Sequence, residues 1–143
     1  MKKCFIVLNH KPTEEQLDEL RVYHQVTEFC YPDAGSSWKW ANISPDDDLG
    51  DIIFSIQNLR HWIRDNSKPG DYIWVQGEPT SQTWLVHEAL TYWKLVPVFA
   101  TTRRESVEVV KDGVTTKTNV FKHVRFRKFD YEVRHGAHRN EER

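Results

Sequence analysis

Polar and charged residues follow three predicted strands, at the point where each strand ends. The three groups are Asn9 and His10, then Gln76, Gly77 and Glu78, and finally Thr101, Thr102, Arg103 and Arg104. Parallel strands of an open α/β sheet bring their carboxyl ends to one edge, and ligands bind in the crevice outside that edge. We therefore expect the three groups to lie together and to form one binding site.

These side chains suit the recognition of a nucleotide. Amide groups can read the edge of a base, and guanidinium groups can bind a phosphate bidentately. The polar loop after residue 76 leads into a helix that Thr80 and Ser81 can cap, and its first N–H groups are expected to face the crevice, ready for an anion. The expected ligand-binding residues are Asn9, Gln76, Gly77, Ser81, Gln82, Thr101 and Thr102.

A further basic group lies near the end of the chain. Residues 120–129 alternate as a strand does, which predicts two faces. One face is expected to carry Phe121, His123, Arg125 and Arg127, and the other Lys122, Val124, Phe126 and Lys128. Phosphate binding is one interpretation of Lys122 and His123. An edge strand that uses charge to resist aggregation is the other.

Charge is unevenly distributed along the 143 residues, although the whole chain has a net charge of −1. Residues 103–143 hold 11 Lys and Arg against 7 Asp and Glu, a net +4, whereas residues 1–102 hold 9 against 14, a net −5. A basic end fits a phosphate-bearing partner, but the neutral total argues against binding along a long nucleic acid. A small, multiply charged nucleotide fits both observations.

Familiar catalytic motifs are missing from the predicted core. The sequence has no glycine-rich dinucleotide motif, no P-loop, no nucleophile elbow and no metal-ligand spacing, and Cys4 and Cys30 are expected to be buried reduced thiols. Cleavage of an RNA phosphodiester needs none of these, because the attacking group is the substrate's own 2′-hydroxyl. We therefore expect no metal and no cofactor.

Hydrophobic periodicity predicts alternating strands and helices. Strands are expected over residues 3–8, 26–31, 71–76 and 95–100, and helices over residues 13–24, 52–66 and 81–93. Residues 36–50 are expected to form an irregular loop, which leaves Trp38 and Trp40 as the tryptophans not assigned to the core. Strands over residues 106–111 and 114–119 flank Asp112 and Gly113, a type I′ hairpin turn.

This order of elements predicts an α/β, Rossmann-like parallel sheet with helices on both faces and a C-terminal β-hairpin extension. Residues 1–130 are expected to form one domain, and residues 131–143 a charged, flexible tail. No run of residues is long and apolar enough for a membrane span, and no signal peptide is evident. We expect a cytoplasmic protein.

Several blocks of the chain resemble one family of small CRISPR-associated accessory proteins, the twentieth of the Csx series. They are KPGDYIWVQGE (68–78), VPVFATTRRE (96–105), KDG (111–113), FKHVRFRKF (121–129) and LNH (8–10), so that the resemblance covers residues 1–130. Members of this family look like stand-alone CARF domains, Rossmann-like modules that bind cyclic oligoadenylates. The resemblance thus implies a CARF-like fold.

The resemblance also implies an activity, that of a ring nuclease. It would cleave cyclic tetra-adenylate without metal, give linear products with a 2′,3′-cyclic phosphate and switch off type III CRISPR antiviral signalling. It implies a homodimer, with the ligand across two strand-end pockets. The catalytic residues expected on this basis are Arg103, Arg104, Lys122, His123 and His10. A protein that binds the messenger without cleaving it is the alternative, and a scaffold for another protein is a third.

Overall fold

The strands of the computed structural model, which describes residues 1–129, form one five-stranded sheet in the order β2-β1-β3-β4-β5. The elements are β1 (Lys2–Val7), α1 (Glu14–His24), β2 (Val26–Cys30), α2 (Ala34–Ala41), α3 (Leu49–Ser55), α4 (Gln57–Asn66), β3 (Tyr72–Val75), α5 (Pro79–Glu88), the π-helical turn η1 (Ala89–Trp93), β4 (Val96–Lys111) and β5 (Val114–Lys128). The expected tail over residues 131–143 lies outside the described residues.

The first four strands of the sheet are parallel, and only β5 runs antiparallel to its neighbour β4. All four residues of β3 are buried, as expected for a central strand covered on both faces. The α/β fold with a largely parallel sheet is therefore confirmed, and its arrangement is compatible with a Rossmann-like fold.

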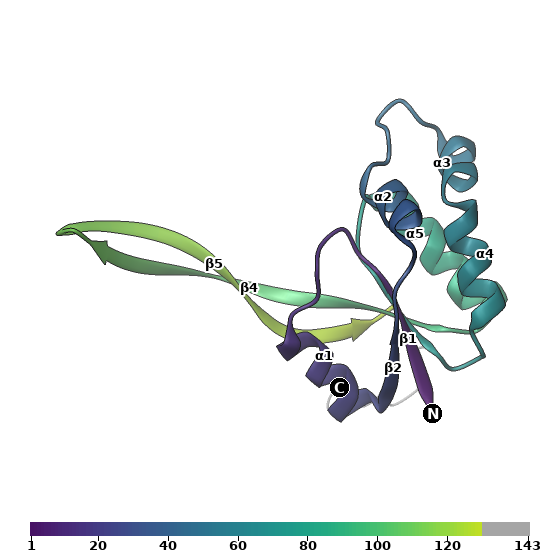
Figure 1. Cartoon of the computed structure of the whole chain (residues 1–143), viewed down its shortest axis with the longest axis horizontal. Coiled ribbons are helices and arrows are strands. Elements are labelled where there is room, and N and C mark those ends of the chain that lie inside the picture. The colour runs from purple at the N-terminus through teal and green to yellow at the C-terminus, as the bar shows by residue number, and fades with distance from the viewer. Residues whose placement is uncertain (130–143) are drawn as a thin grey trace, which may run out of the picture.

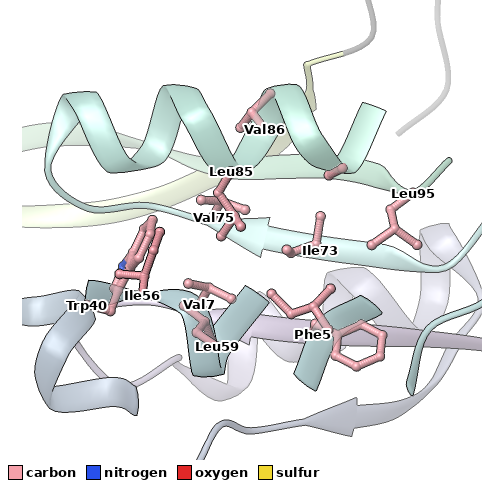
Figure 2. Close-up of a cluster of buried hydrophobic side chains, with 12 residues drawn as sticks. Phe5, Val7, Trp40, Ile56, Leu59, Ile73, Val75, Leu85, Val86 and Leu95 are labelled. Atoms are coloured by element: carbon pink, nitrogen blue, oxygen red, sulfur yellow. The ribbon is translucent and has the colours of Figure 1, made fainter. Parts of the chain in front are cut away.

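Helices cover both faces of the sheet, and a separate hydrophobic cluster lies under each layer (Figure 1). On one face, α2, α4 and α5 pack on side chains such as Val7, Ile73 and Val75, as Figure 2 shows. On the other face, α1 packs Leu20 against residues that include Ile6 and Trp74. Side chains on both faces of β1 and β3 are therefore buried under helices.

The helix over residues 13–24 forms as its capping pattern predicts. The Thr13 hydroxyl accepts a hydrogen bond from the Gln16 N–H at 3.2 Å, and the Gln16 side chain accepts one from the Thr13 N–H at 2.9 Å. This reciprocal pair satisfies two backbone donors at the helix start. The helix ends at Gln25, which is left-handed with φ 57°.

Two predictions about the helices before β3 are wrong. The expected loop over residues 36–50 contains a helix, α2, because the Asp33 carboxylate caps it by accepting the Ser36 N–H at 2.8 Å. Trp40 of this helix is buried in the core. The expected single helix over residues 52–66 is interrupted at Ile56, although its apolar positions stay buried on both sides of the break.

The C-terminal hairpin is longer than predicted. The strand that was expected to end at residue 100 continues to Lys111, and the two strands expected over residues 114–129 are one. Asp112 and Gly113 both have positive φ, 54° and 75°, which confirms the type I′ turn. Beyond the body of the protein the two strands continue as a projecting two-stranded ribbon (Figure 1).

A β-bulge changes the faces predicted for residues 120–129. Thr101 pairs with Arg125, but Thr102 pairs with His123, so Val124 is an extra residue in β5. An extra residue reverses the alternation on its strand. His123 therefore lies on the α1 side of the sheet together with Phe126, rather than on the opposite side as predicted.

Candidate functional site

An open groove of about 780 Å³ lies at the carboxyl ends of β1 and β2. Its walls are the loop after β1, the first turns of α1, the loop after β2 and one side of α2. The lining residues are Ile6, Leu8, Asn9, His10, Lys11, Pro12, Glu14, Leu17, Tyr31, Pro32, Ala34, Ser37, Trp38, Ala41 and Asn42. The groove thus lies at the edge of the sheet where ligands of α/β proteins bind.

The loop after β1 supplies the polar side of the groove. Asn9, His10 and Lys11 are all exposed there, and they offer an amide, an imidazole and an ammonium group. The His10 Nδ1 lies 3.1 Å from the carbonyl oxygen of Lys11, and its ring stands edge-on to Trp74 with 6.5 Å between centroids. These contacts hold the imidazole over the end of the sheet.

Two aromatic side chains supply the apolar side. Tyr31 and Trp38 are 53% and 64% exposed, so much of each aromatic side chain is accessible from the groove. Partial burial raises the pKa of the Tyr31 hydroxyl, and the neighbouring Cys4 and Glu14 act in the same direction. A planar ring can stack on such side chains, because exposed aromatic faces are what nucleobases bind.

The Gln76 side chain is engaged within the protein. Its oxygen accepts hydrogen bonds from the Trp74 indole at 2.6 Å and from the Ala100 N–H at 2.9 Å. The Gln82 oxygen similarly accepts the Gly77 N–H at 3.0 Å. These two amides join β3, β4 and α5, and they do not line the groove.

Glu78 caps α5, so the prediction that Thr80 and Ser81 act as caps is wrong. The Glu78 carboxylate accepts the Ser81 N–H at 2.9 Å and the Thr80 N–H at 3.0 Å, while the buried Ser81 hydroxyl donates to the Glu78 carbonyl. Partial desolvation opposes ionisation of this carboxyl, but the hydrogen bonds outweigh it and lower its pKa. A carboxylate of the chain itself therefore occupies the expected anion position.

Gly77 lies against the indole of Trp40. A Cβ at this position would come within 2.7 Å of the Trp40 Nε1, and that nitrogen donates to the Gln76 carbonyl at 3.0 Å. The absence of a side chain at Gly77 thus serves the packing of α2 on the sheet. Gly77 was expected to bind ligand, but it does not line the groove.

The expected phosphate-binding cations lie on the hairpin, in the middle of strands rather than at a strand end. Arg103 pairs with Lys122 and Arg104 pairs with Phe121 across the ribbon, which places the two arginines on opposite faces. Arg104 lies over the Phe121 ring at 5.3 Å, and Lys122 forms a 3.3 Å ion pair with Glu105.

Thr101 and Thr102 also lie within β4. The Thr101 hydroxyl donates to the Arg125 carbonyl at 2.9 Å, beside the bulge at Val124, and it accepts the Arg125 N–H. It therefore satisfies backbone groups that the bulge displaces from the ladder. Thr102 is exposed and follows directly.

His123 is placed in a buried polar cluster under α1. Its Nε2 lies 2.7 Å from the Glu19 carboxylate, whose other oxygen accepts the Phe126 N–H at 2.9 Å. His24 lies beside them, 3.7 Å from Glu19 and 3.3 Å from the Tyr72 hydroxyl. Burial lowers the pKa of His24, against the opposing attraction of Glu19.

The structure brings only part of the predicted site together. Asn9 and His10 line the groove, whereas the other ten predicted residues are absent from its lining. Trp38, one of the two tryptophans set apart from the core in the sequence, also lines the groove, whereas Trp40 is buried. Sequence reasoning missed Lys11, Tyr31 and Asn42. Lys11 directly follows Asn9 and His10, which is a usable signal, whereas nothing in the local pattern marks Tyr31 or Asn42. Among residues 1–129, no three His, Cys, Asp or Glu side chains gather as metal ligands would.

The fold and this groove define a Rossmann-like α/β protein with a candidate binding site at its strand ends. The chain belongs to the family described as the uncharacterized protein MJ1673 family, whose model matches residues 2–127. It is 33% identical over 130 residues to the uncharacterized protein MJ1673 of Methanocaldococcus jannaschii, which covers 91% of this chain and 98% of that protein. No solved structure gives a significant match. In the part of the chain that the structure describes, no helix is both long and apolar enough to cross a membrane.

Proposed function

We propose that this chain binds a cyclic oligoadenylate, cyclic tetra-adenylate first, in the groove at the ends of β1 and β2. The observation that carries the proposal is the composition of that groove, in which Tyr31 and Trp38 face solvent beside Asn9, His10 and Lys11. Aromatic side chains stack on bases, amides read base edges and a lysine binds phosphate as a point charge. The choice of a cyclic oligoadenylate as the ligand comes from the resemblance to the CARF-like accessory family.

The proposed reaction is opening of the ring without metal or cofactor. The ribose 2′-oxygen loses its proton and attacks the adjacent phosphorus, the bond to the 5′-oxygen breaks, and that oxygen takes up a proton. A linear product with a 2′,3′-cyclic phosphate results. His10 is the imidazole of the groove that can move a proton, and the Lys11 ammonium can stabilise charge on the phosphorane.

Other parts of the proposal rest on the resemblance alone. These are the homodimer that shares one ligand, the cytoplasmic location, the antiviral CRISPR context and the catalytic roles of Arg103, Arg104, Lys122 and His123. None of these four residues lines the groove. A homodimer would place two grooves around a ligand that is itself twofold symmetric.

Binding without cleavage is the second candidate function, and specific contacts favour it. His123 is held by Glu19, Lys122 by Glu105, and the helix N–H groups of α5 by Glu78. Lys122 and His123, two of the groups expected to promote cleavage, are therefore engaged within the protein, whereas the groups needed for binding line the groove.

Incubation of the purified chain with labelled cyclic tetra-adenylate in EDTA separates the candidates. Linear product with a 2′,3′-cyclic phosphate supports the ring nuclease, and intact ligand retained by the protein supports the binding protein. We expect Trp38→Ala and Lys11→Ala each to weaken retention about ten-fold or more, since one stacked base or phosphate contact is lost.

Two variants serve as matched controls for this experiment. Tyr92→Ala removes an exposed aromatic side chain, and Lys39→Ala an exposed lysine of α2, and neither residue lines the groove. Both should retain the ligand as the unmodified chain does. If the unmodified chain neither retained the ligand nor gave linear product, both candidate functions would be overturned.

A further inference from the structure

Cationic side chains gather on one face of the hairpin, in the part of β4 and β5 that lies nearest the body. We call this surface the basic face, and it carries Thr101, Arg103, Lys122, Arg125 and Arg127. It lies on the side of the sheet opposite α1, because Ala100 and Phe126, the neighbours of Thr101 and Arg125, pack with the α1 side chains instead. Beyond Val98, β4 pairs only with β5 among the described strands, so this part of the sheet is a two-stranded ribbon that leads away from the body (Figure 1).

The β-bulge at Val124 brings these cations together. In a regular strand, Lys122 would lie on the face opposite Arg125 and Arg127, because side chains alternate. The extra residue reverses the alternation, so that Lys122 pairs with Arg103 on the face that also carries Arg125 and Arg127. Bulges often re-aim a side chain next to a functional site. The bulge thus gives the basic face three cations from β5 instead of two.

The charges of the basic face are poorly compensated by the chain itself. Arg103 and Lys122 lie directly opposite each other, and like charges in this arrangement destabilise a strand pair. Lys122 has an ion pair with Glu105 at 3.3 Å. Among residues 1–129, Arg103, Arg125 and Arg127 form no ion pair with a carboxylate. A bound anion would offset the repulsion that the fold creates here.

The guanidinium groups are accessible and partly fixed in place. Arg103 and Arg127 are exposed, and Arg127 lies over the Phe99 ring at 5.9 Å from its centroid. The half-buried Arg125 donates its Nε–H to the Phe126 carbonyl at 3.1 Å. A guanidinium has five N–H donors, so these contacts leave several donors for the oxygens of an anion.

The dimensions of the basic face fit a nucleic-acid backbone. From Phe99, opposite Arg127, to Arg103, opposite Lys122, β4 advances by four residues. This is about 13 Å at about 3.3 Å per residue, or about four steps of 3.4 Å along one strand of a duplex. Single strands bind largely by stacking on aromatic rings. Here Phe99 lies under Arg127 and the 63% exposed Phe121 lies on the opposite face, which favours a duplex.

We propose that the basic face binds the phosphate backbone of a nucleic-acid duplex without reading its sequence. Contacts to phosphates position a protein on a duplex and carry no sequence information directly. Residues 1–102 have a net charge of −5 and do not extend the basic surface. The neutral total of the chain therefore argues against a long contact, but a local contact with about four phosphates needs only this cluster. No residue of the basic face lines the groove, so this binding is separate from the function proposed above.

Fluorescence anisotropy of a labelled DNA duplex of about 20 base pairs, titrated with the full chain, tests the contact. We expect binding at about 50 mM salt that weakens steeply toward about 200 mM. Arg127→Ala should weaken binding about five-fold or more and reduce the slope of log affinity against log salt by about one, since one phosphate contact is lost.

Lys128→Ala is the matched control for this variant. Lys128 is the exposed neighbour of Arg127, carries the same charge and lies on the opposite face, over the Tyr72 ring. Its removal should leave the salt slope unchanged. If the unmodified chain did not bind the duplex at low salt, or if both variants weakened binding equally, the proposal would be overturned.

Competition separates the duplex from other anionic ligands. Excess cyclic tetra-adenylate should not displace the duplex, and Lys11→Ala in the groove should bind the duplex as the unmodified chain does. Displacement by cyclic tetra-adenylate would assign the basic face to that ligand and overturn the duplex proposal. Binding to vesicles of phosphatidylserine and phosphatidylcholine that Arg127→Ala loses, without binding to the duplex, would overturn it in favour of a membrane surface.

Discussion

A single neighbour explains why residue 77 is a glycine. The Trp40 indole lies so close that a Cβ at position 77 would meet three of its atoms at 2.7 to 3.0 Å. The same indole donates to the Gln76 carbonyl, so it cannot move away without losing a partly buried hydrogen bond. One residue thus couples α2 to the end of β3.

We expect Gly77→Ala to lower the free energy of unfolding by about 1–3 kcal/mol, the usual cost of overpacking a core. Urea unfolding followed by tryptophan fluorescence measures it. Gly50→Ala is the control, because the nearest atom to its Cβ, at 3.3 Å, is a carboxylate oxygen of Asp48 at the end of a side chain. A Gly77→Ala protein as stable as the Gly50→Ala protein would contradict this explanation.

At the residue scale, the sequence predicted positions better than roles. Gln76, Gly77 and Ser81 follow β3 as expected. However, the side chains of Gln76 and Ser81 form hydrogen bonds with the protein's own backbone, and the missing side chain of Gly77 leaves space for the Trp40 indole. Sequence alone cannot separate an amide that faces a ligand from one that bridges two strands, because the difference lies in residues distant along the chain.

At the element scale, the start of α5 depends on Glu78. A carboxylate there satisfies two N–H groups that the helix cannot bond itself and also interacts favourably with the positive end of the helix dipole. The pKa of the Glu78 carboxyl is lowered in the folded protein, which means that the ionised form of this carboxyl stabilises the fold. The cap contributes stability at pH values above the ordinary 4.5 of a glutamate, and the contribution is lost as the pH falls through the lowered value.

Glu78→Ala should therefore reduce the free energy of unfolding by about 0.5–2 kcal/mol at neutral pH, as loss of a helix cap does. Chemical denaturation at neutral and acidic pH measures the change, and the difference from the unmodified chain should shrink in acid. Glu78→Asp, a preferred capping residue, should recover most of the loss. A pH-independent difference would show that the carboxylate charge has no part in the cap.

The elements differ in how clearly the sequence marks them. The helix α1 has a capping box and apolar spacing, and its prediction is confirmed. The helix α2 is short and carries Gly35, two serines and the exposed Trp38, so that only its cap residue Asp33 signals a helix. The strand β4 is predicted as two shorter strands because the polar and charged run Thr101–Arg104 in its middle resembles a strand end, whereas the pairing with β5 continues through that run.

At the scale of the whole molecule, the buried cluster of Glu19, His24 and His123 joins α1 to β3 and β5. Glu19 accepts the Phe126 N–H, and His24 meets the Tyr72 hydroxyl. These hydrogen bonds thereby join β5 to α1, the helix that also forms one wall of the groove. Any change of charge in this cluster acts on the stability of the whole domain.

The pH dependence of unfolding should report this cluster. Burial lowers the pKa of His24, Glu19 opposes the effect and Lys128 adds to it, so the folded protein binds a proton at this site less readily than the unfolded chain. The free energy of unfolding should therefore decrease as the pH falls below the ordinary value of 6.5. His24→Gln cannot titrate, so its unfolding free energy should depend less steeply on pH.

Urea unfolding between about pH 5.5 and pH 7.5 measures these slopes, because the slope reports the difference in bound protons between the folded and unfolded states. His61→Gln is the matched control, since His61 is an exposed histidine of α4 away from the cluster. Its slope should equal that of the unmodified chain. If His24→Gln and His61→Gln gave the same slope, the acid sensitivity of the domain would have to arise outside the cluster under α1.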